Sequence, residues 1–374
     1  MTRLHELHDD QGQSPWLDNL RRSWIQGGDL ADWVDRGVRG ITSNPSIFQK
    51  AIAGSADYDD QFASCLDAGM SVEDTYWDLV VTDIEGALAV LRPVYDASGG
   101  GDGFVSVEVA PSLARDTEGT ARAALDLHQR IAEPNLYVKI PGTAEGLPAI
   151  QKVIAQGHSV NVTLLFSLSR YGEVIEAHQA GLEELVASGA SAEEVARVSS
   201  VASFFVSRVD AEVDRRLEVI GTEAATALKG RAAVANARLA YRLFRERYAG
   251  PRWEALAAAG AQVQRPLWAS TSTKDPSYPD TLYVDSLIGP DTVNTLPDAT
   301  LEAFLDHGTV ARTVDTADDE ALRTLDELAD VGVDLDDVTQ LLEKEGVEAF
   351  EASYDDLLST LGEKAEALRP GSDG

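Results

Sequence analysis

The sequence predicts an α/β fold, a (β/α)8 TIM-type barrel with extra helices and a C-terminal helical tail. Short apolar, β-branched segments bounded by Gly, Pro or polar turns alternate with longer stretches of helical spacing, which is the pattern of βαβ units. Eight such segments are present. The chain of 374 residues is also long enough for one barrel, which typically needs roughly 250 residues or more.

The predicted strands follow one another along the chain. They are PWLDNL near residue 15, VRGITSN near 38, GFVSVEVA from 103, NLYVKI from 135, SVNVTLLFS from 159, VSSVASFFVS from 198, RPLWASTS from 265 and TLYVDSLIG from 281. Bounding turns and β-branched composition together favour strands at these positions.

The linking stretches have helical start and stop signals. Asp116 is placed to cap ARAALDLHQRIAE, Ser191 begins a capping-box pattern, and an Ala-rich helix from residue 224 ends at Gly250 and Pro251. After about residue 310 an acidic helical segment is expected to pack outside the barrel, and RPGSDG at the end is expected to fray. We therefore expect one domain over 1–374, with the barrel at about 15–310 and a helical extension at about 311–370.

Composition and charge exclude several classes of protein. The chain has no apolar run near the roughly 20 residues of a membrane-spanning helix, and its N-terminus has no secretory-signal pattern, so we expect a cytoplasmic protein with no membrane partner. Its formal charge of -32 disfavours nucleic acid as a partner. Cys65 is the only cysteine, which excludes an internal disulfide, and we expect it to be buried in a helix.

One lysine differs from the others in its surroundings. Lys139 lies within the apolar segment Leu136–Ile140, whereas the lysines at 50, 152, 229, 274, 344 and 364 lie in loops or helical stretches. An ammonium inside that strand would be desolvated, so part of it would be the neutral amine that attacks a carbonyl. The alternative is a lysine that reaches into water or pairs with a carboxylate.

Neighbouring strands carry polar residues at comparable positions. Glu108 shares a strand face with Ser106 and Phe104, because alternate residues of a strand point the same way. The others are Asn161 and Thr163 on one face of NVTLLFS, Asp18 in WLDNL, and Asn44 at the turn after VRGITSN. Each has a structural alternative, such as a turn for Asn44 or a helix cap for Asp18. Their occurrence on successive strands favours a site at the C-terminal rim of a barrel.

Two cations follow later strands. Arg208 comes after SFFVS, and Lys274 comes after ASTST, near Ser270 and Ser272. Cations beside small hydroxyl residues suit a phosphate, although surface ion pairs are an equal alternative in an acidic protein. The histidines at 5, 8, 128, 158, 178 and 307 have no metal-ligand spacing, and no dinucleotide fingerprint, P-loop or nucleophile elbow is present. We expect neither a metal nor an organic cofactor.

Five segments together resemble the transaldolases. They are ITSNPSIF, VSVEVAPSLARDTEGT, NLYVKIPGT, NVTLLFS and SFFVSRVD, which occur in the order of that family. The resemblance runs from about Pro15 to the acidic tail, and WLDNL, WASTSTKDP and LYVDSLIGP look most like a bacterial branch whose members also occur fused to a phosphoglucose isomerase.

The resemblance implies a mechanism. Lys139 would form an imine with fructose 6-phosphate or sedoheptulose 7-phosphate, Glu108 and a water held by Thr163 would move protons, and Asp18 would take the C4 hydroxyl proton. The dihydroxyacetone unit would then pass to an aldose phosphate, as in the pentose phosphate pathway. The substrate contacts implied are Thr42, Asn44, Asn161, Ser203, Phe205, Arg208, Ser270 and Lys274.

One position departs from the family pattern, and other functions stay open. Many transaldolases have an arginine where this sequence has Ser272, so Lys274 is expected to replace it and Arg208 is the firmer phosphate contact. A fructose 6-phosphate aldolase that releases free dihydroxyacetone is the nearest alternative. A barrel that only binds sugar phosphates is another. The sequence leaves a monomer and a homodimer equally open.

Overall fold

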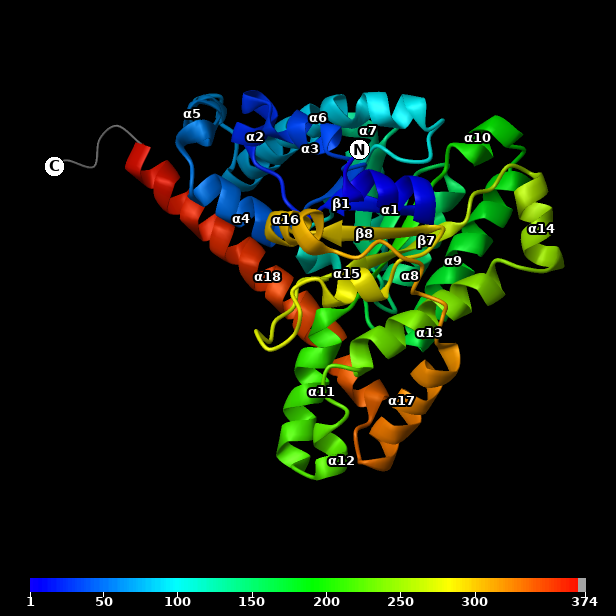
Figure 1. The fold of residues 1–374 in the computed structure, drawn as a ribbon. Coiled ribbons are helices and arrows are strands. Elements are labelled where there is room, and N and C mark those ends of the chain that lie inside the picture. The colour runs from blue at the N-terminus through cyan, green and yellow to red at the C-terminus, as the bar shows by residue number, and fades with distance from the viewer. Residues whose placement is uncertain (369–374) are drawn as a thin grey trace.

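A closed barrel of eight parallel strands forms the centre of the computed structural model, which describes residues 1–368 (Figure 1). The strands are β1 (Gln13–Leu17), β2 (Gly40–Thr42), β3 (Phe104–Glu108), β4 (Leu136–Pro141), β5 (Val160–Leu165), β6 (Ser200–Phe205), β7 (Gln264–Ala269) and β8 (Thr292–Leu296). Each strand pairs with the next in the sequence, and β8 pairs with β1. The predicted (β/α)8 barrel is confirmed.

Helices surround the barrel. They are α1 (Arg3–Gln11), α2 (Arg22–Gly27), α3 (Asp29–Asp35), α4 (Pro45–Ala53), α5 (Asp59–Asp67), α6 (Val72–Ala97), α7 (Thr117–Ile131), α8 (Gly146–Ala155), α9 (Leu168–Ala187), α10 (Ala192–Ala196), α11 (Ser207–Ile220), α12 (Glu223–Thr226), α13 (Ala232–Arg247), α14 (Pro251–Ala258), α15 (Leu282–Ser286), α16 (Asp298–His307), α17 (Asp318–Asp330) and α18 (Leu335–Leu368). Asp116 caps α7 and Ser191 forms a capping box at α10, as predicted. Cys65 is buried in α5, also as predicted.

The eighth strand was predicted in the wrong place. The segment from residue 281 contains α15, and β8 begins at Thr292. In α15, Tyr283 donates a hydrogen bond to Asp210 Oδ2 at 2.9 Å, and Thr281, which precedes the helix, donates to Asp285 at 3.0 Å. The Tyr283 contact ties the segment to α11 beside the barrel. The sequence prediction was wrong because a short apolar run fits either a strand or a helix.

The Ala-rich helix predicted from residue 224 is also interrupted. The chain forms α12 and then α13, and Gly230 between them has a φ of 70°, which a residue with a side chain rarely adopts. A Cβ at this position would also lie 2.8 Å from the ring of Tyr278. The helix therefore breaks where the chain needs a glycine.

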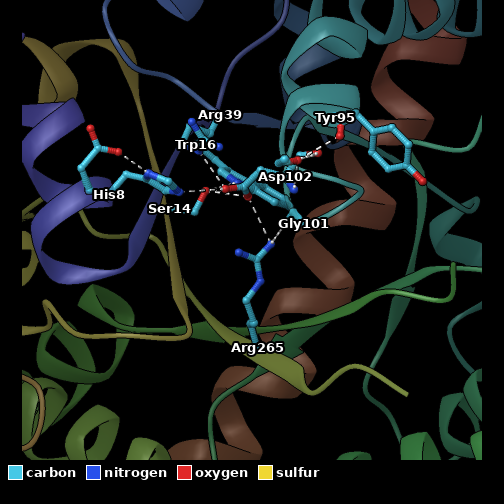
Figure 2. A network of polar contacts seen from close by, with 10 residues as sticks. His8, Ser14, Trp16, Arg39, Tyr95, Gly101, Asp102 and Arg265 are labelled. Carbon is cyan, nitrogen blue, oxygen red and sulfur yellow. Dashed lines mark hydrogen bonds and ion pairs between the residues drawn. The ribbon is translucent and has the colours of Figure 1, made fainter. Parts of the chain in front are cut away.

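A buried aspartate and two partly buried arginines close the N-terminal end of the barrel (Figure 2). Asp102 Oδ2 lies 2.8 Å from Arg39 Nε, and its Oδ1 lies 3.2 Å from Arg265 Nη2 and accepts a hydrogen bond from Ser14 at 2.8 Å. Burial alone would raise the pKa of Asp102, but the charges of Arg265 and Arg39 outweigh it and lower that pKa. The carboxylate therefore stays ionised within this end of the barrel.

Aromatic rings fill the next layer of the interior. Tyr137 stacks on Phe104, with ring centroids 4.2 Å apart, and on Trp16 at 5.9 Å. A Cβ at Gly40 would lie 2.4 Å from the Trp16 ring, so glycine is required where β2 passes it. Side chains therefore fill the barrel interior beneath the polar residues at the C-terminal ends of the strands.

The C-terminal helix crosses the outside of the barrel. In Figure 1, α18 runs from beside α11 to beside α4, and it contacts both of these helices and α6. Ser353 Oγ lies 2.8 Å from Ser46 Oγ on α4, and Tyr354 donates to Glu73 on α6 at 2.9 Å. The predicted helical tail is confirmed, whereas the predicted fraying of residues 369–374 lies outside the described residues. No helix within residues 1–368 combines the length and apolar character that a membrane span requires.

Candidate active site

A cavity of about 780 Å³ lies at the C-terminal ends of the barrel strands. Ten of the residues predicted for the site line it. These are Asp18, Thr42, Asn44, Lys139, Thr163, Ser203, Phe205, Arg208, Ser270 and Lys274. The other two, Glu108 and Asn161, contact members of this group inside the barrel. The fold thus brings together side chains from segments distant in the sequence, at the end of the barrel where active sites lie.

Lys139 is the only buried lysine among the residues that the structure describes. Its Nζ donates a hydrogen bond to the carbonyl oxygen of Ser43 at 3.0 Å and lies 3.0 Å from Glu108 Oε2. The strand register explains the second contact, because Glu108 on β3 lies directly beside Lys139 on β4. The lysine therefore pairs with a carboxylate, which was one of the alternatives considered from the sequence. The pair lies inside the barrel, however, and Lys139 lines the cavity.

Glu108 lies in surroundings that favour the exchange of a proton with Lys139. Burial raises the pKa of Glu108, and the positive charge of Lys139 lowers it only in part. Its Oε2 has no aligned hydrogen-bond donor among the described residues, although Lys139 Nζ is within ion-pair distance. A carboxyl group with a raised pKa beside an amine is suited to general acid–base chemistry.

Asp18 occupies the wall beside the lysine. Burial raises its pKa, while a hydrogen bond from Thr42 at 2.7 Å and the charge of Lys139 act in the opposite direction. Thr42 Oγ1 also lies 2.5 Å from Thr295 Oγ1 on β8. Asp18 follows the end of β1 and caps no helix, so the cap alternative is wrong. The two threonines fix one oxygen of a carboxylate that faces the cavity.

Thr163 has an unpaired hydroxyl. Its Oγ1 is buried and has no hydrogen-bond partner in the described part of the chain, and Thr163 lines the cavity. The next residue, Leu164, has a φ of 61°, and the register between β5 and β6 shifts between Val162 and Leu165. A bulge therefore sets the position of Thr163, as bulges often do beside functional sites.

Two asparagines have different roles in the structure. Asn161, which pairs with Lys139 in the strand register, donates to Ser106 at 3.1 Å and accepts from Ser203 at 2.7 Å, so its amide is fixed in the interior. Asn44 Oδ1 accepts from the backbone N–H of Ile47 at 3.0 Å and caps α4, so its structural role is that of a helix cap and not of the turn residue given as its alternative. The amide nitrogen of Asn44 remains for the cavity, because the cap uses only the oxygen.

The cations lie together at the other side of the cavity. Arg208 is in the first turn of α11, with its guanidinium 5.1 Å from the ring centroid of Phe205, and Lys274 donates to Ser272 at 3.0 Å. Burial and then the charge of Arg208 lower the pKa of Lys274. Neither cation has a carboxylate within 4.0 Å among the described residues, so neither forms a surface ion pair. A pair of free cations at a helix N-terminus suits a phosphate.

Ser270 is held beside these cations. Its φ is 56°, its Oγ lies 2.9 Å from Ser207 Oγ, and its carbonyl accepts the backbone N–H of Ser207 at 3.0 Å. These contacts join the end of β7 to the start of α11. Ser207 directly precedes Arg208 in the sequence, and Ser270, Arg208 and Lys274 line the same cavity.

The C-terminal helix contributes to the wall, which the sequence did not reveal. Phe350 of α18 lines the cavity, and a Cβ at Gly346 would lie 3.7 Å from Arg208 Nη1. Three further residues were missed: Ser43, which accepts from Lys139, Thr295 on the misplaced strand, and Lys50 on α4. Within residues 1–368 no group of three or more His, Cys, Asp or Glu side chains is placed to hold a metal.

Comparisons with known proteins agree with this geometry. The family model described as Transaldolase/Fructose-6-phosphate aldolase matches residues 15–361. The chain is 52% identical over 360 residues to a protein of Acidothermus cellulolyticus named Transaldolase, covering 96% of both chains. It is 50% identical over 372 residues to Transaldolase 1 of Streptomyces avermitilis (99% of this chain, 97% of the relative), and 48% identical to Transaldolase of an Arthrobacter species over the whole of both chains.

Proposed function

The chain belongs to the transaldolase/fructose-6-phosphate aldolase family, and we propose that it transfers a dihydroxyacetone unit between sugar phosphates through an imine on Lys139. The observation that carries this proposal is the buried Lys139 against Glu108 at the base of the cavity. An amine in such surroundings is available as a nucleophile when its proton can pass to a neighbouring carboxylate.

The first half of the reaction forms the covalent intermediate. Lys139 gives a proton to Glu108, and its neutral amine attacks the C2 ketone of fructose 6-phosphate or sedoheptulose 7-phosphate. Glu108 then returns a proton to the carbinolamine hydroxyl, which leaves as water and gives the imine. Thr163 holds the water through which this proton passes, because its hydroxyl is buried and unpaired within the described residues.

The second half breaks and remakes a carbon–carbon bond. Asp18 accepts the C4 hydroxyl proton, the C3–C4 bond breaks, and its electron pair moves into the imine to give an enamine and a free aldose phosphate. Asn44 and Asn161 hold the enamine until its C3 attacks glyceraldehyde 3-phosphate or erythrose 4-phosphate, and Asp18 returns the proton. Water then releases the new ketose from Lys139. The protonated imine is the electron sink, so these steps require no metal or organic cofactor.

Phosphate binding offsets the charge of the protein locally. At -32 the chain repels anions on average, whereas Arg208 and Lys274 give the far side of the cavity two free positive charges. Ser207 and Ser270 add hydroxyl groups beside them. Such contacts anchor the phosphate and leave the carbon chain of the sugar extended toward Lys139.

The second candidate is an aldolase that releases free dihydroxyacetone, because the matching family description names both activities. Turnover of fructose 6-phosphate with and without erythrose 4-phosphate separates them. A transferase forms sedoheptulose 7-phosphate only with the acceptor and releases little dihydroxyacetone without it. Release of dihydroxyacetone at the same rate in both assays would identify the aldolase, and no turnover in either would contradict both. A cytoplasmic location remains a prediction.

A further inference from the structure

One cation that lines the cavity, Lys50 on α4, has no role in the mechanism described above. Lys50 is exposed on α4 and has no carboxylate within 4.0 Å among the described residues. Asp57 and Asp298 line the same cavity, yet neither is within that distance. Acidic residues outnumber basic ones by 63 to 31, so partners for a lysine are abundant in this chain. The absence of one here indicates that the ammonium has another use.

The face of α4 that carries Lys50 points into the cavity. Ser46, Ile47, Lys50 and Ala51 all line it, which is the spacing of one face of a helix. The helix itself is anchored, because Asn44 caps it and Ser46 contacts Ser353 on α18 at 2.8 Å. Lys50 is therefore directed toward the site by a fixed backbone, although its side chain is exposed.

The ammonium of Lys50 lies near the other free cations. Lys274 has its pKa lowered first by burial, then by Arg208, and also by Lys50, while Asp18 acts in the opposite direction. Arg21, Arg22 and Lys139 also line the cavity, but Lys274 feels the charges of Arg208 and Lys50 in particular. These three positive charges repel one another and favour an anion between them. A phosphate monoester carries about -1.5 to -2 charges at pH 7 and three acceptor oxygens, so it suits three donors.

We propose that Lys50 is a third cationic contact for the substrate phosphate, together with Arg208 and Lys274. This inference rests on the proposed function and deepens it, because it makes α4 part of the recognition of phosphorylated over unphosphorylated sugars. It also gives a reason for the packing of α4 on α18, since that packing sets the distance of Lys50 from the cations of α11 and the β7 loop.

The test replaces Lys50 with methionine, which keeps an unbranched helix-forming side chain and removes the charge. The Lys50→Met enzyme should show a KM for fructose 6-phosphate and an inhibition constant for inorganic phosphate that are both raised about 3- to 10-fold. Turnover of unphosphorylated fructose, with erythrose as acceptor, should change by less than about twofold. Lys50→Arg should restore most of the phosphate affinity.

A matched control separates a contact from a change in overall charge. Lys152→Met alters the net charge equally on α8, where Lys152 pairs with Glu118 at 2.8 Å outside the cavity, and should leave all three constants unchanged. Equal effects of Lys50→Met and Lys152→Met, or an equal loss with fructose, would overturn the role of Lys50. If Arg208→Ala weakens phosphate binding and Lys50→Met does not, only this inference fails. If neither does, the proposed phosphate site fails as well.

Discussion

Lys139 Nζ and Glu108 Oε2 lie 3.0 Å apart within the barrel, and both side chains are more than nine-tenths buried. Their strands place them side by side, and burial raises the pKa of Glu108. A proton held between these groups can pass from the ammonium to the carboxylate without a change in net charge. This pairing connects the fold to the proposed imine chemistry.

Replacing Glu108 with glutamine should slow imine formation. Gln keeps the shape and removes the proton acceptor, so kcat should fall by about 10² to 10⁴ while KM changes less. Steady-state rates with fructose 6-phosphate and erythrose 4-phosphate measure both constants. A Glu108→Gln enzyme with near-normal kcat would exclude Glu108 as the acid–base group.

The hydrogen bond from Thr42 to Asp18 should set the pH at which activity is lost on the acidic side. Asp18 must be ionised to accept a proton, and its pKa is raised by burial but lowered by the Thr42 hydroxyl. Activity should fall as the pH decreases through this raised pKa. In Thr42→Val the lowering contact is lost, so the acidic limb of the kcat profile should move to higher pH. A limb that stays in place or moves to lower pH would show that Asp18 is not the titrating base.

Thr163→Val should separate stability from catalysis. The valine has nearly the same shape, and the hydroxyl it removes is buried without a protein partner among the described residues, so the free energy of unfolding should change by less than about 1 kcal/mol. The kcat should nevertheless decrease by about 10- to 100-fold, because the proton path loses its held water. Urea unfolding and steady-state kinetics measure the two effects. Normal kcat would contradict the assigned role.

Phosphate anchoring by Arg208 predicts a dependence on the donor. Arg208→Ala should raise KM for fructose 6-phosphate by about tenfold or more and affect unphosphorylated fructose far less, because only the first donor has a phosphate to anchor. Lys274→Ala should have the same effect more weakly, since burial and then the charge of Arg208 already lower the pKa of Lys274. Equal losses with both donors would mean that these residues support the fold instead.

Local patterns in the sequence placed most of the barrel but not its last strand. TVNTL, which forms β8, has few strongly apolar residues. Its polar side chains are satisfied in the interior instead, because Asn294 hydrogen-bonds with Thr271 and Thr295 with Thr42. TLYVDSLIG looked more like a strand, yet its apolar side chains pack beside the barrel. Composition alone could not show that TVNTL and not TLYVDSLIG is the strand, because the polar partners of β8 lie on other strands.

The candidate active site could also be predicted from the sequence only in part. Lys139 could be singled out because its own strand is apolar, and Glu108 followed from strand parity. Lys50, Thr295 and Phe350 enter the cavity only through packing of α4, β8 and α18, which no local pattern encodes. Motifs identified the chemistry, whereas the walls of the cavity required the tertiary structure.

Borohydride trapping shows whether Lys139 forms the imine with the substrate. Incubation with fructose 6-phosphate and borohydride should inactivate the enzyme and leave one reduced three-carbon unit on the peptide that contains Lys139, because cleavage leaves the dihydroxyacetone part as the imine. Lys50→Met should still be labelled, and Lys139→Met should not. Peptide mapping by mass spectrometry that found no adduct under turnover conditions, or found it on another lysine, would contradict the account.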